Sequence, residues 1–420
     1  MTTTLLIEGG RPLSGHVAVE GNKNSALPLI AACLLTDERC ELLNVPHITD
    51  VDVMVSLLEG LGATVTRPRD HTLEITCAEV RSDRPDPAQV GRLRGSVLLL
   101  GPLLGRVGRV RLASPGGDFP TRRTIATHLQ ALLFLGARRT DDGGGHVLEA
   151  PDGLEGASFY LDEASVTGTE TALLAAAAAR GVSEIRHAAC EPHVVELCRF
   201  LEAMGVGIEG AGTSTLRVHG AARRRGASHR LGGDYIEAGS WAVLAAVTRG
   251  ELEIHGATPG DLEPITTVLE RMDVACRVDD DKLVIHRSSP VALRRLTTGL
   301  WPGFPSDMVS LLTVLATQAR GQMLIHDWLY ELRLFALEQL SGMGADLFLC
   351  DPHRIIATGP SRLRGRTLDS RDLRSGMALI AAGLAADGET RLAPLELVER
   401  GYADIVARLQ GVGARVERLS

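Results

Sequence analysis

The sequence LEGLGATV (residues 58–65) returns in altered form five more times along the chain. Each copy has the pattern Leu-x-x-apolar-Gly-Ala or a close variant, and an alternating stretch follows it. Glycine readily takes the left-handed conformation that ends a helix, so each copy predicts a helix that stops and a strand that begins. The marker position recurs roughly every 70 residues. Its six occurrences are Gly62, Gly136, Gly205, Asp273, Gly344 and Gly413.

Each repeat also has an earlier helix, which precedes the marker helix. This earlier helix ends near a glycine and leads into a strand, as in AVLAAVTRGELEIHG (242–256). A unit of strand, helix, strand, helix and two paired strands accounts for both patterns. Three such units could close around a pseudo-threefold axis with their helices inside. Six units therefore predict an α/β protein of two inside-out α/β barrel domains, each of three βαβαββ-like units. TALLAAAAAR (171–180) is typical of a tightly packed central helix.

Two places in the sequence suggest crossings between the domains. One lies near Gly21, after a first strand, and the other is the Arg-rich stretch AARRRGASHR (221–230). We therefore expect a discontinuous domain of residues 1–21 plus 230–420. The second domain, residues 22–229, would be inserted into it and would carry a loop at 114–124.

Composition excludes several classes of protein. The chain has 420 residues, 45% of them hydrophobic, which suffices for large buried cores. A net charge of −8 and 3% aromatic residues argue against nucleic-acid binding. No apolar run reaches the ~18 residues of a membrane span, and MTTTLLIEGG (1–10) lacks the features of a signal peptide. Seven cysteines without a C-x-x-C pair indicate reduced thiols, so we expect a cytoplasmic protein without a zinc site.

Three segments carry candidate chemistry. GNKNSALP (21–28) places Lys23 and Asn24 where a strand meets a helix. The free amides of a helix start attract anions, and a lysine there adds positive charge. The same pattern is also typical of a solvated helix cap with a surface lysine. The loop SPGGDFPTRRTIATH (114–128) offers Asp118 as a mobile acid beside arginines that could clamp a phosphate, or it is an ordinary turn. FPSDM (304–308) places Asp307 before an apolar helix, where an aspartate also serves as an N-cap.

Several arginines lie near the second helices of the repeats. They occur in ELR (331–333), RDLRSG (371–376) and VERGY (398–402), and each by itself reads equally well as a surface ion pair. Arg94, in RLRGSVLLLGP, begins a very apolar helix. A charge with a purely structural role is less expected there than on a polar surface. GVGIEG (205–210) follows a helix and precedes a strand, the reverse of the order in dinucleotide-binding folds.

Together these motifs resemble those of the enolpyruvyl transferases, from GHVAVEGNKNSALP (15–28) to VERGYADI (398–405). The resemblance implies two inside-out α/β domains, in agreement with the repeat. It also implies transfer of the enolpyruvyl group of phosphoenolpyruvate to an acceptor hydroxyl, without a metal or organic cofactor. The similarity is greatest to members that use the 3-hydroxyl of UDP-N-acetylglucosamine in peptidoglycan biosynthesis. The implied partners are small molecules, with neither nucleic acid nor membrane among them.

The resemblance also implies roles for individual residues. Lys23, Asp118 and Asp307 would be catalytic, with Asp307 deprotonating the acceptor hydroxyl and Asp118 acting from the closing loop. The remaining implied roles are phosphoenolpyruvate binding by Lys23, Arg94, Arg123 and Arg400; acceptor binding by Asn24, Arg123, Thr124, Ser165, Val166, Asp307, Leu329 and Arg333; and lining of the cleft by Asp234, Glu237, Asp372 and Arg374.

Departures from the family pattern concern the loop acid and the acceptor. The position of Asp118 is usually Cys, the residue that fosfomycin alkylates, so we expect resistance to that antibiotic. On the acceptor side, Ala126 replaces an Asp, Glu163 a Lys, Cys190 an Arg and Leu332 an Asn. An acceptor with one phosphate fewer, the 3′-hydroxyl of UMP in nucleoside antibiotic biosynthesis, is therefore the alternative. A non-catalytic binding paralogue is a further alternative, which the presence of Lys23, Arg94, Arg123, Asp307 and Arg400 disfavours. An RNA 3′-phosphate cyclase is another, which the low pI and the few aromatic residues disfavour.

Overall fold

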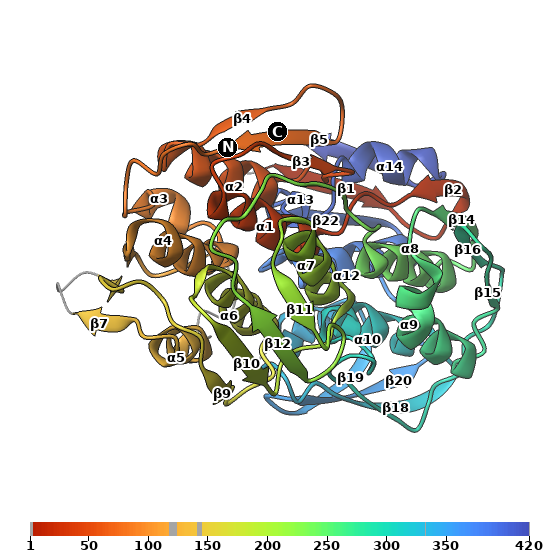
Figure 1. Cartoon of the computed structure of the whole chain (residues 1–420). Coiled ribbons are helices and arrows are strands. Elements are labelled where there is room, and N and C mark those ends of the chain that lie inside the picture. Colours follow the sequence, from red (N-terminus) through yellow and green to blue (C-terminus); the bar gives the residue numbers. More distant parts are fainter. Residues whose placement is uncertain (1–2, 117–123, 141–144, 332, 420) are drawn as a thin grey trace. The chain divides into compact units, whose positions relative to one another are not determined.

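The computed structural model describes residues 3–116, 124–140, 145–331 and 333–419. The chain divides into two compact units, and Figure 1 traces it through both. One unit contains Met1–Glu20 and Gly233–Ser420 and is called the split unit here. The other contains Gly21–Gly232 and is called the inserted unit. Both consist of helices and mixed sheets, so the prediction of an α/β protein is confirmed.

All six marker positions have the predicted backbone conformation. Their φ angles lie between +57° and +110°, in the left-handed region. Gly62, for example, follows α2 (Thr49–Gly60) and precedes β4 (Thr64–Thr66). Asp273 takes the same conformation with φ +57°, which aspartate tolerates better than most residues. The repeat read from the sequence is therefore a repeat of backbone geometry.

Strand pairing repeats as well. Five four-stranded sheets each combine one parallel pair with two antiparallel pairs. In the inserted unit the sheets are β13 (Ser228–Arg230)–β3 (Cys40–Leu43)–β5 (Thr72–Thr76)–β4; β11 (Gly207–Glu209)–β12 (Thr215–His219)–β10 (Val182–Arg186)–β9 (Ser158–Tyr160); and the antiparallel β6 (Arg109–Leu112)–β8 (His146–Glu149)–β7 (Arg138–Thr140).

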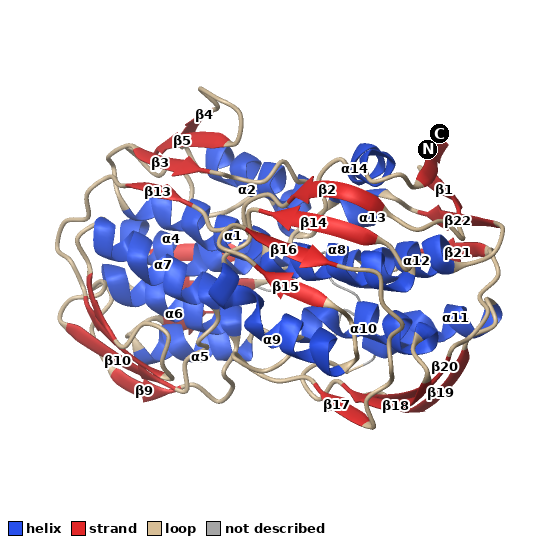
Figure 2. Ribbon diagram, turned by 90° about the vertical axis from the view of Figure 1, so that its right-hand side faces the viewer, coloured by secondary structure: helices blue, strands red, loops and turns tan. Residues whose placement is uncertain are grey.

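The sheets of the split unit follow the same scheme. They are β21 (Thr367–Asp369)–β22 (Glu389–Ala393)–β1 (Thr4–Glu8)–β23 (Arg415–Leu419); β15 (Cys276–Val278)–β16 (Lys282–Ile285)–β14 (Glu251–His255)–β2 (Ser14–Ala18); and β17 (Arg295–Thr297)–β18 (Gly321–His326)–β20 (Arg354–Gly359)–β19 (Asp346–Asp351). β1 and β2 come from the start of the chain and pair with strands that follow residue 233. Figure 2 shows β15, β16, β14 and β2 side by side, in front of a buried helix.

Each unit also contains helices. In the inserted unit they are α1 (Lys23–Ala32), η1 (Cys33–Leu35), α2, α3 (Pro87–Val90), η2 (Arg94–Leu99), α4 (Leu100–Val107), α5 (Ala126–Phe134), α6 (Val166–Ala178) and α7 (Pro192–Ala203). In the split unit they are α8 (Tyr235–Val247), α9 (Pro259–Arg271), η3 (Ser306–Met308), α10 (Val309–Gln318), η4 (Arg333–Glu338), α11 (Gln339–Gly342), α12 (Leu373–Ala385), α13 (Glu396–Glu399) and α14 (Ile405–Gly411). None of the helices in the described ranges is both long and apolar enough to cross a membrane.

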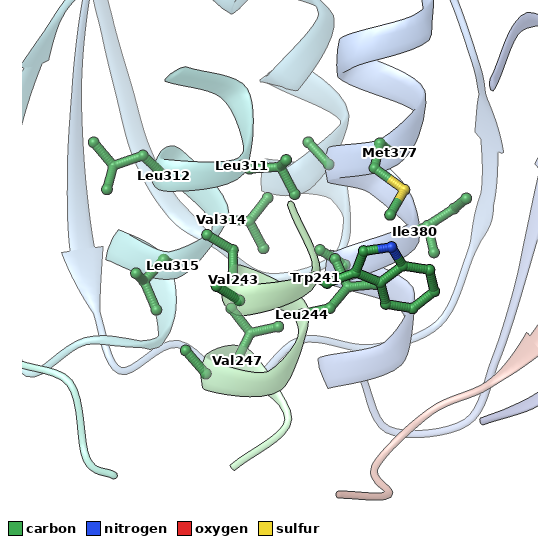
Figure 3. Close-up of a cluster of buried hydrophobic side chains, with 14 of the residues drawn as sticks. Trp241, Val243, Leu244, Val247, Leu311, Leu312, Val314, Leu315, Met377 and Ile380 are labelled. Carbon is green, nitrogen blue, oxygen red and sulfur yellow. The ribbon is translucent and has the colours of Figure 1, made fainter. Parts of the chain in front are cut away.

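The core of the split unit forms where α8, α10 and α12 pack on one another. Every residue of α8 is buried, because apolar side chains predominate along the whole helix. Figure 3 shows Trp241 and Leu244 of α8 near Leu311 of α10 and Met377 of α12. The polyalanine helix α6 is likewise buried from Gly168 to Ala177, as its composition predicted. Several candidate site residues lie at or near the starts of such helices: Asp234 at α8, Asp372 at α12 and Ser165 at α6.

Candidate active site

Asp307 of η3 forms the centre of a charged cluster in the split unit. Its Oδ1 accepts a hydrogen bond from Nη1 of Arg333 at 3.1 Å. Its Oδ2 accepts from Nη2 and Nε of Arg374 at 2.8 and 3.2 Å. The N-cap of α10 is Met308. Asp307 precedes it by one residue, so Asp307 is not the N-cap of this helix. The structure thus brings together three residues that the sequence analysis singled out separately.

The buried carboxylate of Asp327 supports this cluster through Ser306. Ser306 accepts a hydrogen bond from Nη1 of Arg333 at 2.7 Å and donates one to Oδ2 of Asp327 at 2.7 Å. Asp327 is fully buried, and its Oδ1 accepts from Thr298 at 2.8 Å. Because Ser306 and Asp307 are adjacent in η3, the same turn binds Arg333 through both residues.

Tyr402 holds the other side of Arg374. Its hydroxyl lies 3.2 Å from Nη1 of Arg374 and 2.8 Å from Oγ of Ser240 in α8. Tyr402 and Ser240 are completely buried. The guanidinium of Arg374 is therefore fixed between an aspartate and a tyrosine, which leaves it little freedom to turn.

The electrostatics of the cluster keep both arginines charged. Burial opposes the charge on Arg374, but Asp307, Tyr402 and Asp234 together outweigh burial, so the pKa of Arg374 lies above its usual value. The same balance raises the pKa of Arg333. Two permanent cations thus orient one carboxylate that is 27% exposed. Such a group can accept a proton from a hydroxyl while its neighbours stabilise developing negative charge.

Most of the other predicted residues of the split unit lie at or near helix ends. Asp234 and Asp372 are the N-caps of α8 and α12, and each accepts two backbone N–H groups. Glu237 is buried, pairs with Arg408 and accepts from the Trp241 indole at 3.2 Å. Arg400 follows α13 as its C-cap, and Leu329 is half-buried in the segment after β18. Asp234, Glu237 and Asp372 therefore all have contacts within the scaffold.

In the inserted unit, Lys23 begins α1 and pairs with an acid that the sequence did not single out. Its Nζ lies 2.6 Å from Oδ2 of Asp50 in the first turn of α2. The side chains of Lys23 and Asp50 are 12% and 4% exposed. Asn22 is the N-cap of α1 and accepts the N–H of Asn24 at 2.8 Å. The predicted cation at a helix start is thus present and is anchored by a buried carboxylate.

Arg94 lies at the start of η2 and donates to the carbonyl of Thr124 at 2.7 Å. Burial of His128 and, to a lesser extent, the positive charge of Arg94 lower the pKa of His128 to about 3, so this imidazole is neutral. His128 Nε2 lies 2.9 Å from the hydroxyl of Thr167 in α6. Ser165 is the N-cap of α6, and Val166 is its first residue. His128 thus interacts with the charge of Arg94 and contacts the start of α6.

Some predicted residues lie outside the described part of the chain. These are Asp118, Arg123 and Leu332. Thr124 is described and exposed, as is Glu163. Cys190 is half-buried, and burial together with the neighbouring Glu191 raises its pKa.

Sequence reasoning missed the residues that support the charged groups. Asp50, Asp327, Ser240 and Tyr402 belong to them, and each lies far along the chain from its partner. Tyr402 stands two residues after Arg400 in VERGY, and an aromatic residue inside a charged motif is a signal that could have found it. The short polar side chain of Ser240 inside the apolar helix α8 is another.

Comparisons with known proteins agree over the whole chain. A family model described as EPSP synthase (3-phosphoshikimate 1-carboxyvinyltransferase) matches residues 7–409. UDP-N-acetylglucosamine 1-carboxyvinyltransferase of Bradyrhizobium diazoefficiens is 43% identical over 99% of this chain and 97% of its own length. The protein of the same name from Treponema denticola is 40% identical over 98% of both chains. The enolpyruvyl transferase NikO from Streptomyces tendae has a similar structure, with a TM-score of 0.90, 25% identity and coverage of 100% and 99%.

Proposed function

The chain belongs to the EPSP synthase family of carboxyvinyltransferases, and from this premise we propose that it transfers the enolpyruvyl group of phosphoenolpyruvate to the 3-hydroxyl of UDP-N-acetylglucosamine. The observation that supports this acceptor best is the set of full-length relatives of that name, at 43% and 40% identity. The resemblance found in the sequence is confirmed by these matches. The reaction would serve peptidoglycan biosynthesis in the cytoplasm.

The proposed reaction balances without a redox step. A proton adds to C3 of phosphoenolpyruvate, and the acceptor oxygen forms a bond to C2 as it loses its own proton. The resulting tetrahedral intermediate loses inorganic phosphate from C2 and a proton from C3. The products are the enolpyruvyl ether of the acceptor and phosphate. The protein must therefore move two protons and stabilise several negative charges.

Asp307 is the proposed base for the acceptor hydroxyl. Its carboxylate is partly exposed, while Arg333 and Arg374 hold both of its oxygens in place. Arg333 and Arg374 would also stabilise negative charge that develops on the acceptor oxygen. Asp234, Glu237 and Asp372 act through the scaffold, since their carboxylates cap or pair with neighbouring groups.

Lys23 and Arg94 are the proposed phosphoenolpyruvate ligands of the inserted unit, with Arg123 as a third and Arg400 as the ligand from the split unit. Lys23 stands at the first residue of α1, where helix N–H groups favour an anion. Asp118 is the proposed acid that delivers a proton to C3. Asn24, Thr124, Ser165, Val166 and Leu329 complete the proposed acceptor contacts.

A second acceptor, the 3′-hydroxyl of UMP, is favoured by two departures from the family pattern. One of them, Glu163, is exposed and lies shortly before α6. Glu163 replaces a family lysine, and Cys190 a family arginine. A site with fewer cations suits an acceptor with fewer phosphates.

The test is phosphate release from phosphoenolpyruvate with either acceptor in parallel, followed by mass analysis of the product. We expect release with UDP-N-acetylglucosamine and a product that is heavier by one enolpyruvyl group. Release with UMP alone would replace the first acceptor by the second. No release with either nucleotide, from protein that binds phosphoenolpyruvate, would overturn enolpyruvyl transfer to uridine nucleotides and favour the binding paralogue.

We also propose that each unit is an inside-out α/β barrel. The support is that the described part of each unit carries three sheets, and that α8, α10 and α12 pack on one another with nearly every residue buried.

A further inference from the structure

Two imidazoles and a carboxylate lie together at one end of the β13–β3–β5–β4 sheet. His47 belongs to the segment between β3 and α2, and Asp70 and His71 form part of the turn between β4 and β5, which Figure 1 shows as neighbouring strands. One candidate ligand atom from each of the three side chains lies within 4.8 Å of the other two. Nε2 of His47 is 2.7 Å from Oδ1 of Asp70, and Nε2 of His71 is 3.8 Å from Oδ2. None of these residues has a role in the proposed reaction.

The backbone holds His71 in a position suited to a ligand. Its Nδ1 lies 3.0 Å from the carbonyl oxygen of Val45, and its own carbonyl accepts the N–H of Val45 at 2.9 Å. A carbonyl oxygen can only accept, so Nδ1 carries a proton, and Nε2 is the ring nitrogen that can bind a metal. Metal-binding histidines are commonly oriented by this kind of bond from the other ring nitrogen to a carbonyl. The Nε2 of His71 is the atom that approaches Asp70.

His47 completes the set. Its ring centroid is 4.3 Å from that of His71, with 67° between the planes. The backbone N–H of His71 donates to Nε2 of His47 at 3.4 Å, while the same Nε2 lies 2.7 Å from the Asp70 carboxylate. A donor and an acceptor therefore compete for one nitrogen. A cation bound between Nε2 and the carboxylate would satisfy both the nitrogen lone pair and the carboxylate charge.

The spacing suits a small divalent ion. Zinc bonds to histidine nitrogen and carboxylate oxygen at about 2.0–2.2 Å, so tetrahedral ligand atoms lie roughly 3.3 Å apart. The separations of 2.7 and 3.8 Å bracket this value, and the side chains are exposed enough to adjust. We propose that His47, Asp70 and His71 bind one Zn²⁺ ion, which would join the β3–α2 segment to the β4–β5 turn. Three protein ligands leave a fourth position for water.

Nearby arginines have carboxylate partners of their own. Arg67 and Arg69 line the same surface hollow of ≈ 190 Å³. Arg67 pairs with Asp52 at 2.5 Å, and Arg69 with Glu41 at 3.4 Å. Their charges are thus partly neutralised. Two imidazoles with one carboxylate form a donor set that suits zinc better than magnesium or calcium.

The test is calorimetric titration of the full-length, tag-free, chelator-treated protein with ZnCl₂ alone. A Cys350→Ser background removes the exposed thiol as a competing ligand. We expect one zinc ion per chain, and at least ten-fold weaker binding in His47→Ala and in His71→Ala. The matched control is His219→Ala. His219 is a similarly exposed histidine that pairs with Glu209 at 3.0 Å without a second imidazole, so this variant should bind zinc like the parent.

Thermal unfolding gives a second readout. Zinc should raise the Tm of the parent and of His219→Ala, because the ion binds the folded state. It should leave His47→Ala and His71→Ala unchanged, and these variants should melt like the parent without zinc if they are folded. Equal zinc affinity in the parent and in both histidine variants would overturn the site, as would equal losses in the His219→Ala control. Phosphate release is measured separately, so failure of the zinc site would leave the proposed function standing.

Discussion

Replacing Asp307 by asparagine tests the centre of the proposed site. Asn has the shape of Asp but no charge, and one of its two terminal atoms is a hydrogen-bond donor. In the native cluster Oδ2 accepts twice from Arg374, and Oδ1 accepts from Arg333. Whichever way the amide turns, its NH₂ group faces a guanidinium that also donates. At least one of the three hydrogen bonds is therefore lost, and both arginines lose the carboxylate that they contact directly.

The magnitude follows from burial. The side chains of Arg333 and Arg374 are 12% and 9% exposed, so their charges are poorly solvated once Asp307 is neutral. Removing one partner of a fully buried ion pair costs about 3–5 kcal/mol. Because Asp307 is 27% exposed, water compensates part of this loss, and we expect a decrease in unfolding free energy of about 2–4 kcal/mol. Loss of the base should lower kcat by roughly 10²–10⁴-fold.

Two assays separate these effects. Urea unfolding followed by circular dichroism measures stability, and phosphate release at saturating phosphoenolpyruvate and acceptor measures kcat. Asp346→Asn is the matched control, because it removes one exposed carboxylate from β19 of the same unit. It should change unfolding free energy and kcat little.

The assignment would be refuted by one clear result. If Asp307→Asn stays folded under the assay conditions and keeps kcat within ten-fold of the parent, Asp307 is not the base. A stability equal to that of the parent would refute the claim that its charge holds the two arginines.

Three further predictions concern neighbouring groups. Tyr402→Phe removes a hydroxyl bonded to Arg374, so unfolding free energy should fall by about 1–3 kcal/mol in urea titrations and kcat should decrease; unchanged stability would contradict the hydrogen bond. Burial raises the pKa of Glu237 from 4.5 to about 7. The folded state therefore binds this proton more tightly than the unfolded chain does. The free energy of unfolding should fall as the pH rises between these two values. Glu237→Gln should remove that part of the pH dependence, measured by urea titration at pH 5 and pH 8. Asp118 cannot be alkylated as a cysteine is, so incubation with fosfomycin should leave phosphate release intact, and rapid covalent inactivation would exclude Asp118 as the loop acid.

The sequence predicted the repeat well because the signal is local. A helix that must stop needs a residue that tolerates positive φ, and this requirement recurs at the six marker positions regardless of what packs around them. Asp273 shows that the geometry, rather than glycine itself, is repeated. The apolar character of α6 and α8 similarly predicts helices that are buried on all sides.

The sequence was less informative about partners. Asp307, Arg333 and Arg374 each read equally well as a cap or a surface ion pair, and the motifs that contain them are separated by tens of residues. The carboxylate of Asp50 gave no signal, because one acidic residue in the first turn of a helix is common. The His47–Asp70–His71 group escaped notice for a different reason: it exists only once the segment after β3 and the β4–β5 turn have come together.

By itself, then, the sequence determined where helices end and strands begin, which helices are buried, and which family the chain belongs to. These properties depend on backbone preference and on the periodicity of apolar side chains, and neighbouring residues carry both. Only the tertiary structure decided which charged side chains form pairs. The packing of η3, η4 and α12 places two guanidinium groups on one carboxylate, and that of α1 on α2 buries the partner of Lys23. Electrostatic interactions act through space and depend on burial, so sequence spacing does not encode them.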